Sequence, residues 1–162
     1  MKKVFSFCLI CLLALSAMAQ DQNVNVVVIG GGSSSSSGDY VDLGLPSGTL
    51  WKRQNESGYY TYEQAINRFG SKLPERHHFV ELENKCTWIS LDEYGYRVVG
   101  PNGNSITLPA AGYRDCNGDV HSVGTSGLYW SSTPYAEYAW YFWFSGYTTG
   151  DRCLGLSVRL VQ

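Results

Sequence analysis

The helical pattern of this sequence stops about halfway along the chain, and the second half has the pattern of short strands separated by turns. In the first half, Thr61 and Gln64 form a capping-box pattern ahead of an apolar run that ends in a glycine, which predicts a short helix. A second helix is expected over residues 72–84, with Pro74 in its first turn. From Thr87 onward, β-branched and aromatic segments alternate with turn residues. Two helices ahead of a run of antiparallel strands predict an α+β domain.

The expected strands fall into an early hairpin and a late series. The early hairpin covers residues 39–51, with a turn at Pro46–Gly48 and a second strand that ends in a buried Trp51. The late strands are expected at residues 86–91, 96–100, 105–110, 128–132, 138–144 and 156–161.

The first nineteen residues have the three parts of a secretory signal peptide. Lys2 and Lys3 precede an apolar run over residues 4–15, and small residues come after it, so cleavage is expected before Gln20. The apolar run is too short to cross ~30 Å of hydrocarbon, so no membrane span is expected. We therefore expect an exported protein, secreted or at the cell surface, with the periplasm also compatible.

Residues 20–38 are expected to lie outside the folded domain. A glycine and serine run at residues 30–38 is typical of a flexible linker. The preceding residues 20–29 contain the β-branched pattern NVNVVVI, which fits either an arm without fixed structure or a strand that docks on a sheet edge. Residues 39–162 are then long enough for one domain with its own core.

Charge and cysteine content limit the partners and the compartment. After loss of the signal peptide the chain has ten basic and fourteen acidic residues, and no basic patch is visible, so nucleic acid is not expected as a partner. Cys86, Cys116 and Cys153 remain. They allow one disulfide with one thiol left over, or three small buried apolar side chains, and both alternatives stay open.

Five short segments occur in a fixed order along residues 39–162. They are YVDLGLPSGTLW (40–51), KLPERHHFVEL (72–82), LPAAGYR (108–114), GLYWSST (127–133) and GLSVRLV (155–161). Together they resemble the Fibrobacter succinogenes major paralogous domain family of exported bacterial proteins. The resemblance implies a C-type-lectin-like domain: two short helices flanking a largely antiparallel sheet, with the N- and C-terminal strands paired. It also implies that the late loops carry the ligand site, as in retroelement-diversified proteins of this fold.

A calcium site has an incomplete pattern here. Asp115, Asn117 and Asp119 alternate as in the start of a calcium loop, but Val120 stands where glycine is needed and Ser126 where a bidentate glutamate is needed. The tripeptides of calcium-dependent sugar-binding lectins are also missing from the sequence. We therefore expect an Asn-Gly turn, and neither a metal nor a cofactor.

Two neighbouring histidines on the second expected helix cannot chelate a metal from one face. His77 and His78 point about 100° apart on a helix, so both are expected to be solvated. In the resembled family a threonine begins this helix; Glu75 replaces it here, which implies a weaker N-cap.

Catalysis is not expected. The formylglycine-generating enzymes have a related fold, but their chemistry needs a thiolate pair, and a hydrolase needs a nucleophile beside a base. Cys116 and Cys153 lack recognisable motif residues around them, and His121 is the only histidine in the strand-rich half.

Aromatic residues are concentrated near the C-terminus. Ten of the nineteen residues from Tyr129 to Tyr147 are aromatic. Strict alternation over residues 138–144 puts aromatic side chains on both faces of one strand, so this strand lies between two layers or presents one face outward. Phe142 and Phe144 are expected in the core. Tyrosine and tryptophan also supply rigid binding area with a polar tip. The candidate ligand-binding residues are Tyr135, Tyr138, Trp140, Trp143, Tyr147, Asp151 and Arg152.

The sequence thus predicts an exported, adhesin-like module that binds a protein or glycan through residues 135–152, without a calcium-dependent sugar site. The alternative is a structural subunit that assembles through residues 20–29. Native mass after deletion of residues 20–38 distinguishes the two.

Overall fold

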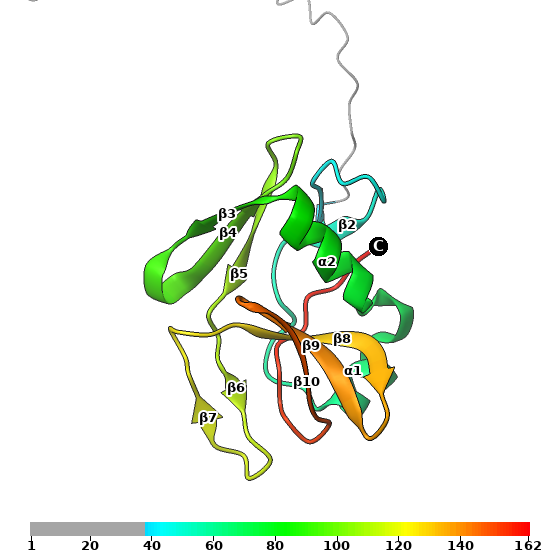
Figure 1. Cartoon of the computed structure of the whole chain (residues 1–162), viewed down its shortest axis with the longest axis vertical. Coiled ribbons are helices and arrows are strands. Elements are labelled where there is room, and N and C mark those ends of the chain that lie inside the picture. Colours follow the sequence, from blue (N-terminus) through cyan, green and yellow to red (C-terminus); the bar gives the residue numbers. More distant parts are fainter. Residues whose placement is uncertain (1–37) are drawn as a thin grey trace, which may run out of the picture. The chain divides into compact units, whose positions relative to one another are not determined.

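The computed structural model describes residues 38–162. The signal peptide over residues 1–19 and the arm and linker over residues 20–38 therefore lie outside the described residues, except for Gly38. The described chain forms ten strands in four small sheets, together with two α-helices and two single 3-10 turns (Figure 1). None of these helices is long and apolar enough to cross a membrane.

Helix α1 spans Tyr62–Phe69 and starts with the predicted capping box. The Thr61 hydroxyl accepts from the Gln64 backbone N–H at 3.3 Å, and the Gln64 side chain accepts from the Thr61 N–H at 3.0 Å. These bonds satisfy two of the backbone donors that a helix start leaves free. The prediction of this helix is confirmed.

Helix α2 spans Arg76–Lys85 and begins later than the predicted residue 72. A 3-10 turn, η1, occupies Gly70–Lys72 instead, and Leu73 is extended with ψ 128°. Proline disfavours the helical conformation in the residue before it, so Pro74 prevents a helix from starting at residue 72.

The early hairpin is as predicted. Strand β1 (Tyr40–Asp42) pairs antiparallel with β2 (Leu50–Lys52). Trp51 lies opposite Val41 and is fully buried.

The next sheet is a meander of three consecutive strands. Strands β3 (Thr87–Ser90), β4 (Gly95–Val99) and β5 (Ser105–Pro109) pair antiparallel in that order. A 3-10 turn, η2 (Asp92–Tyr94), joins β3 to β4. All three predicted strands are present within a residue or two of their expected ends.

The remaining strands form a two-stranded and a three-stranded sheet. Strands β6 (Tyr113–Arg114) and β7 (Val120–His121) form a short hairpin. Strands β8 (Leu128–Tyr135), β9 (Tyr138–Trp143) and β10 (Gly146–Asp151) form the second meander, with β9 in the middle.

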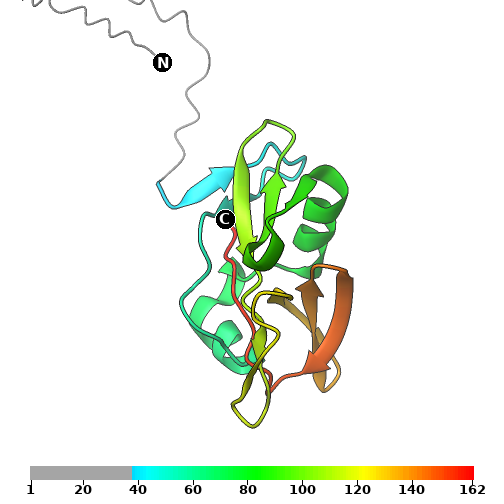
Figure 2. The ribbon, with the colours of Figure 1, turned by 90° about the vertical axis from the view of Figure 1, so that its left-hand side faces the viewer.

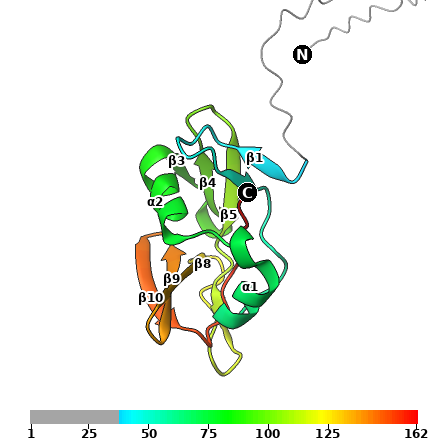
Figure 3. The ribbon, with the colours of Figure 1, turned by 90° about the vertical axis from the view of Figure 1, so that its right-hand side faces the viewer.

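The β8–β9–β10 sheet lies between two apolar layers, and Figure 3 shows α2 and α1 on different sides of it. On one face Phe142 stacks on Phe79 of α2, with ring centroids 5.0 Å apart. On the other face Trp130 meets the edge of Tyr62 of α1 at 5.5 Å. Phe142 is buried as expected, whereas Phe144 is only half-buried beside Tyr96. The sequence left two alternatives for residues 138–144, and the structure shows the first: β9 lies between two apolar layers.

The C-terminal segment, residues 155–161, is buried along its whole length but is not a regular strand. Figure 2 shows it as the red segment that runs through the folded unit to the C-terminus. Leu156 exchanges two backbone hydrogen bonds with Tyr60, Ser157 bonds to β8, and Gln162 exchanges two with Leu50. Because its partner changes every few residues, no continuous ladder forms with any one strand.

The predicted fold class is therefore wrong. The expectation was an α+β, C-type-lectin-like domain with two helices flanking one largely antiparallel sheet. The structure instead has four separate small sheets in a β-rich unit, and the C-terminal segment contacts β2 through the Trp51–Val161 bridge, the adjacent backbone bonds and the Arg159 side chain. Each sheet is a local hairpin or meander, and the buried C-terminal segment bridges them without extending any ladder.

Arg159, in the middle of the C-terminal segment, is fully buried. Its Nε donates to Asn55 Oδ1 at 2.8 Å, Nη1 to the carbonyls of Lys52 and Arg53 at 2.8 Å each, and Nη2 to the Thr107 carbonyl at 2.5 Å. No carboxylate among the described residues pairs with it. Burial lowers the pKa of the guanidinium to about 10, so the group stays charged at neutral pH.

Replacing Arg159 should destabilise the protein more than an ordinary surface change does. In Arg159→Met the carbonyls of Lys52, Arg53 and Thr107 lose their donor inside the fold, and each unsatisfied buried group costs ~1–3 kcal/mol. We expect a loss of about 3 kcal/mol or more in the free energy of unfolding, measured by urea titration at pH 7. The exposed Arg97→Met is the matched control, expected within about 0.5 kcal/mol of wild type. Equal stability of the two variants would refute this role.

Candidate ligand-binding surface

Four of the predicted aromatic residues lie on one face of the β8–β9–β10 sheet. Tyr135 pairs with Tyr138 across β8 and β9. Trp140 and Tyr138 share a face because they are two residues apart on β9, and Tyr147 joins them because it pairs with Phe142. We call Tyr135, Tyr138, Trp140 and Tyr147 the aromatic face. Asp151 pairs with Tyr138 and so lies at the same end.

The aromatic face becomes more exposed with distance from helix α2. Phe142, beneath the helix, is buried, and Trp140 and Tyr147 are half-buried. Tyr135 is 54% exposed and Tyr138 is 38% exposed. The face is thus continuous with the core at one end and open at the other.

Arg76, the first residue of α2, covers the middle of this face. Its guanidinium carbon lies 4.6 Å from the ring centre of Trp140 and 5.4 Å from that of Tyr147. The backbone N–H of Arg76 donates to Thr133 Oγ1 at 3.0 Å, which fixes the helix start against β8. A cation over an aromatic ring contributes ~0.5–1 kcal/mol at exposed sites and also orients the ring. Arg76 was not among the predicted site residues, because nothing local in the sequence connects it to residues 140 and 147.

The rings of the face are also held at their edges. The Tyr147 hydroxyl donates to Glu83 Oε2 at 2.5 Å, and Tyr135 packs edge-on against Trp140 at 5.6 Å. Burial and the bond to the Glu83 carboxylate raise the pKa of Tyr147, so this phenol remains a donor throughout the neutral range. Three of the four rings of the aromatic face are therefore held by contacts within the fold.

Trp143, the fifth predicted aromatic residue, is not part of this face. It lies an odd number of residues from Trp140 along β9 and so points to the opposite side of the sheet, where it is 39% exposed. The structure therefore separates it from the other four.

Arg152, a candidate ligand-binding residue, contacts α1 on the side of the sheet opposite the aromatic face. Its guanidinium lies 4.9 Å over the ring of Tyr62 and donates to Glu63 at 3.0 Å. It also donates to the carbonyls of Ala136 at 2.9 Å and Tyr138 at 3.1 Å. These bonds connect the β8–β9 turn to α1.

The Ala136 turn explains why such support is useful. Ala136 has φ 50°, a left-handed conformation that costs ~1–2 kcal/mol for a residue with a side chain. A two-residue hairpin favours this conformation because its twist matches that of the strands. The bond from Arg152 to the Ala136 carbonyl stabilises the turn that places Tyr135 opposite Tyr138.

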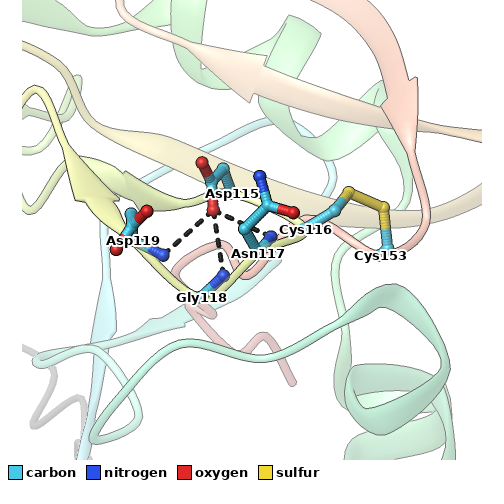
Figure 4. The surroundings of a disulfide bond; sticks show 6 residues. All are labelled: Asp115, Cys116, Asn117, Gly118, Asp119 and Cys153. Carbon is cyan, nitrogen blue, oxygen red and sulfur yellow. Dashed lines mark hydrogen bonds between the residues drawn. A yellow bond between two sulfur atoms is a disulfide. The ribbon is translucent and has the colours of Figure 1, made fainter.

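The Asp115 loop is the predicted Asn-Gly turn. One carboxylate oxygen of Asp115 accepts from the N–H groups of Asn117, Gly118 and Asp119, each at 2.9 Å (Figure 4). Its other oxygen lies 3.0 Å from His121 Nε2, and the bond to His121, together with those backbone bonds, lowers the pKa of Asp115. The carboxylate expected first in a calcium loop closes the turn instead. No cluster of three metal-ligating side chains occurs within residues 38–162.

A disulfide joins this turn to the loop after β10. Cys116 and Cys153 are bonded, with Cα atoms 5.2 Å apart and a separation of 37 positions in sequence (Figure 4). Closing a loop of that length stabilises a fold by about 4 kcal/mol in the chain-entropy account. Cys86 is free, and burial, with a smaller effect of Glu81, raises the pKa of its thiol to about 11. Of the two alternatives for the cysteines, one disulfide with one thiol left over is therefore the one found.

The two histidines of α2 differ. His77 is exposed as expected, but His78 is half-buried and its Nδ1 accepts from the Glu75 backbone N–H at 2.9 Å. His78 thus supplies part of the N-terminal cap that the loss of threonine at position 75 was expected to weaken. Burial, and then the neighbouring charge of His77, lower the pKa of His78.

We predict that truncation of Arg152 destabilises the fold while that of Asp151 does not. Arg152→Gln loses the charge-assisted bonds to the two carbonyls and the cation over Tyr62, which should cost about 1–2 kcal/mol. The adjacent Asp151→Asn should stay within about 0.5 kcal/mol, since Asp151 is exposed. Urea unfolding measures both. An unchanged Arg152→Gln would show that the turn does not need this support.

We also predict a pH dependence that belongs to His78. Its pKa is lower folded than unfolded, so the unfolded chain binds the proton first and the stabilisation present above about pH 6.5 is lost as pH falls. His78→Gln keeps an acceptor at the same helix position and cannot be protonated. Between pH 7.5 and 5 the wild type should lose up to about 1 kcal/mol more stability than His78→Gln, while His77→Gln should keep most of the wild-type loss. Equal losses in all three proteins would contradict the assignment.

The comparisons with known proteins add one match. The chain is similar over residues 99–161 to a family described as a domain of unknown function (DUF8237). That stretch includes β5 to β10 and the C-terminal segment, and thus all four residues of the aromatic face. Neither the curated proteins nor the solved structures gave a match. The resemblance to the Fibrobacter succinogenes family is not tested by these comparisons and stays a prediction.

Proposed function

We propose that this protein is an exported, adhesin-like binding module that recognises a protein or glycan through its aromatic face. One observation carries the proposal: four aromatic side chains share one side of a sheet, Arg76 and Glu83 hold the two at its covered end, and the other two are open to solvent. Trp143 and Arg152 were predicted as ligand residues, but Trp143 lies on the opposite side of the sheet and Arg152 bonds to the β8–β9 hairpin.

Rigid aromatic side chains suit recognition for two physical reasons. Each buries a large apolar area with few rotatable bonds, so little conformational entropy is lost on binding. The hydroxyls of Tyr135 and Tyr138, which have no hydrogen-bond partner within residues 38–162, remain free for a ligand. Asp151 at the same end offers a carboxylate to a donor on the partner.

Export is supported by two independent features. The first is the signal-peptide pattern of residues 1–19. The second is the Cys116–Cys153 disulfide, because such bonds persist in oxidising compartments and are rare in the cytosol of mesophiles.

We propose binding and no catalytic reaction for this protein. Cys116 and Cys153 are joined to each other, and the high pKa of Cys86 leaves little thiolate at neutral pH. His121, the only histidine of the strand-rich half, is hydrogen-bonded to Asp115 in the turn. These contacts favour a module without a metal or cofactor.

The open end of the aromatic face provides the test. The double variant Tyr135→Ser/Tyr138→Ser changes exposed side chains, so it should fold as the wild type does and lose about 2 kcal/mol or more of binding energy, as at a hot spot. The purified chain is first screened on a glycan array and against bacterial and host surface proteins. Affinity is then measured for the best partner by calorimetry.

Tyr94→Ser is the matched control, because Tyr94 is a 71% exposed tyrosine in η2, outside the aromatic face. It should keep wild-type affinity. A partner that binds the double variant as tightly as it binds the wild type places the site elsewhere on the protein.

A further inference from the structure

A second surface lies away from the aromatic face, where the chain enters helix α1. A groove of about 570 Å³ is lined by Tyr59, Tyr60, Gln64, Asn67 and Arg68. This volume is within the range of ~300–1,000 Å³ that small-molecule sites occupy. The three polar residues of α1 are spaced so that they share one side of the helix.

The groove offers hydrogen-bond donors and an excess of positive charge. No carboxylate lines it. The Arg68 guanidinium lies 5.6 Å from the ring centre of Tyr60 and forms no ion pair with any carboxylate of residues 38–162. The Gln64 oxygen is occupied by the helix cap, so its amide N–H groups remain for a ligand.

A second arginine lies over the other tyrosine. The Arg114 guanidinium is 5.6 Å from the ring centre of Tyr59. Gly155 permits this placement: a Cβ there would come within 3.0 Å of the Arg114 Cβ and 3.1 Å of the Tyr59 Cβ. Gly155 and Arg114 also exchange two backbone hydrogen bonds of 2.8 Å.

The disulfide fixes that arrangement. Cys116 comes two residues after Arg114, Cys153 precedes Gly155 by two, and the bond between them closes the Arg114–Gly155 pair. The disulfide thus constrains the backbone at Arg114, whose guanidinium lies over Tyr59, a residue that lines the groove.

We infer that this groove binds an acidic sugar unit, a pyranose ring that carries a carboxylate. The carboxylate pairs with a guanidinium, whose planar N–H donors match its two oxygens. The ring hydroxyls bond to the amides of Gln64 and Asn67, and the apolar ring face packs on tyrosine. This site is separate from the aromatic face. A negative result at the groove would therefore leave the proposed role of the aromatic face unchanged.

Three small probes separate the parts of this recognition. Glucuronate has both ring and charge, glucose has the same ring without the charge, and acetate has the charge alone. Each is titrated into the isotope-labelled protein, and the side-chain amide signals of Gln64 and Asn67 are followed by NMR. We expect glucuronate to bind at least tenfold more tightly than either of the others. If acetate binds as tightly as glucuronate, the groove recognises only an anion. If glucose binds as tightly as glucuronate, the arginines have no role in recognition. Either result, or no binding of glucuronate at all, overturns the inference.

Two variants and two controls complete the test. Arg68→Gln and Arg114→Gln should each weaken glucuronate binding at least about fivefold. Arg97→Gln, an exposed arginine on β4, and Tyr135→Ser/Tyr138→Ser on the aromatic face should leave it unchanged. Wild-type affinity in both groove variants overturns the inference. Loss of glucuronate binding in the aromatic-face variant would show that binding depends on Tyr135 and Tyr138. That result would contradict two separate sites.

Discussion

A buried guanidinium determines how the segments of this protein are held together. Arg159 carries its charge inside the core and donates only to neutral oxygens, three of them backbone carbonyls from two distant parts of the chain. A buried cation that is not paired with a carboxylate is tolerated only where several hydrogen-bond acceptors surround it. The carbonyls of residues 52, 53 and 107 therefore have to meet at the C-terminal segment. That requirement connects the β1–β2 hairpin to the meander of β3, β4 and β5.

The two candidate surfaces depend on this central segment. Its first residues pair with Tyr60 and β8, which places α1 on one side of the β8–β9–β10 sheet. Helix α2 covers part of the opposite side and leaves the aromatic face open beyond Arg76. At its start, Gly155 lets Arg114 lie over Tyr59, one of the residues that line the groove. Each surface is thus built from a local stretch of chain, and an arginine from a distant segment lies over one of its rings: Arg76 over Trp140 and Arg114 over Tyr59.

Local patterns predicted local structure well. The capping box of α1, the Trp51 hairpin, the first meander and strands β8 and β9 depend on neighbouring residues, and all are present. Strand β10 was not predicted. The C-terminal segment has the same strand-like composition, yet its hydrogen bonds go to several different segments, and composition does not encode such partners. The single sheet of the expected lectin-like fold failed for this reason. The alternation of residues 138–144 predicted aromatic side chains on both faces of this strand, as found, but the positions of Arg76 and Arg152 depend on tertiary contacts alone.

Because the C-terminal segment bonds to the β1–β2 hairpin, the 3-10 turn η1 and both meanders, it should open only when the whole protein unfolds. Native-state hydrogen exchange of the backbone amides tests this most directly. The amides of Leu156, Ser157 and Val161 donate to Tyr60, Leu128 and Lys72, so their opening should require global unfolding. Their exchange free energies should equal the unfolding free energy from denaturant titration. Exchange of these amides at a much lower free energy, while the β8–β9 amides stay protected, would show that the segment is a detachable strap and would contradict the account.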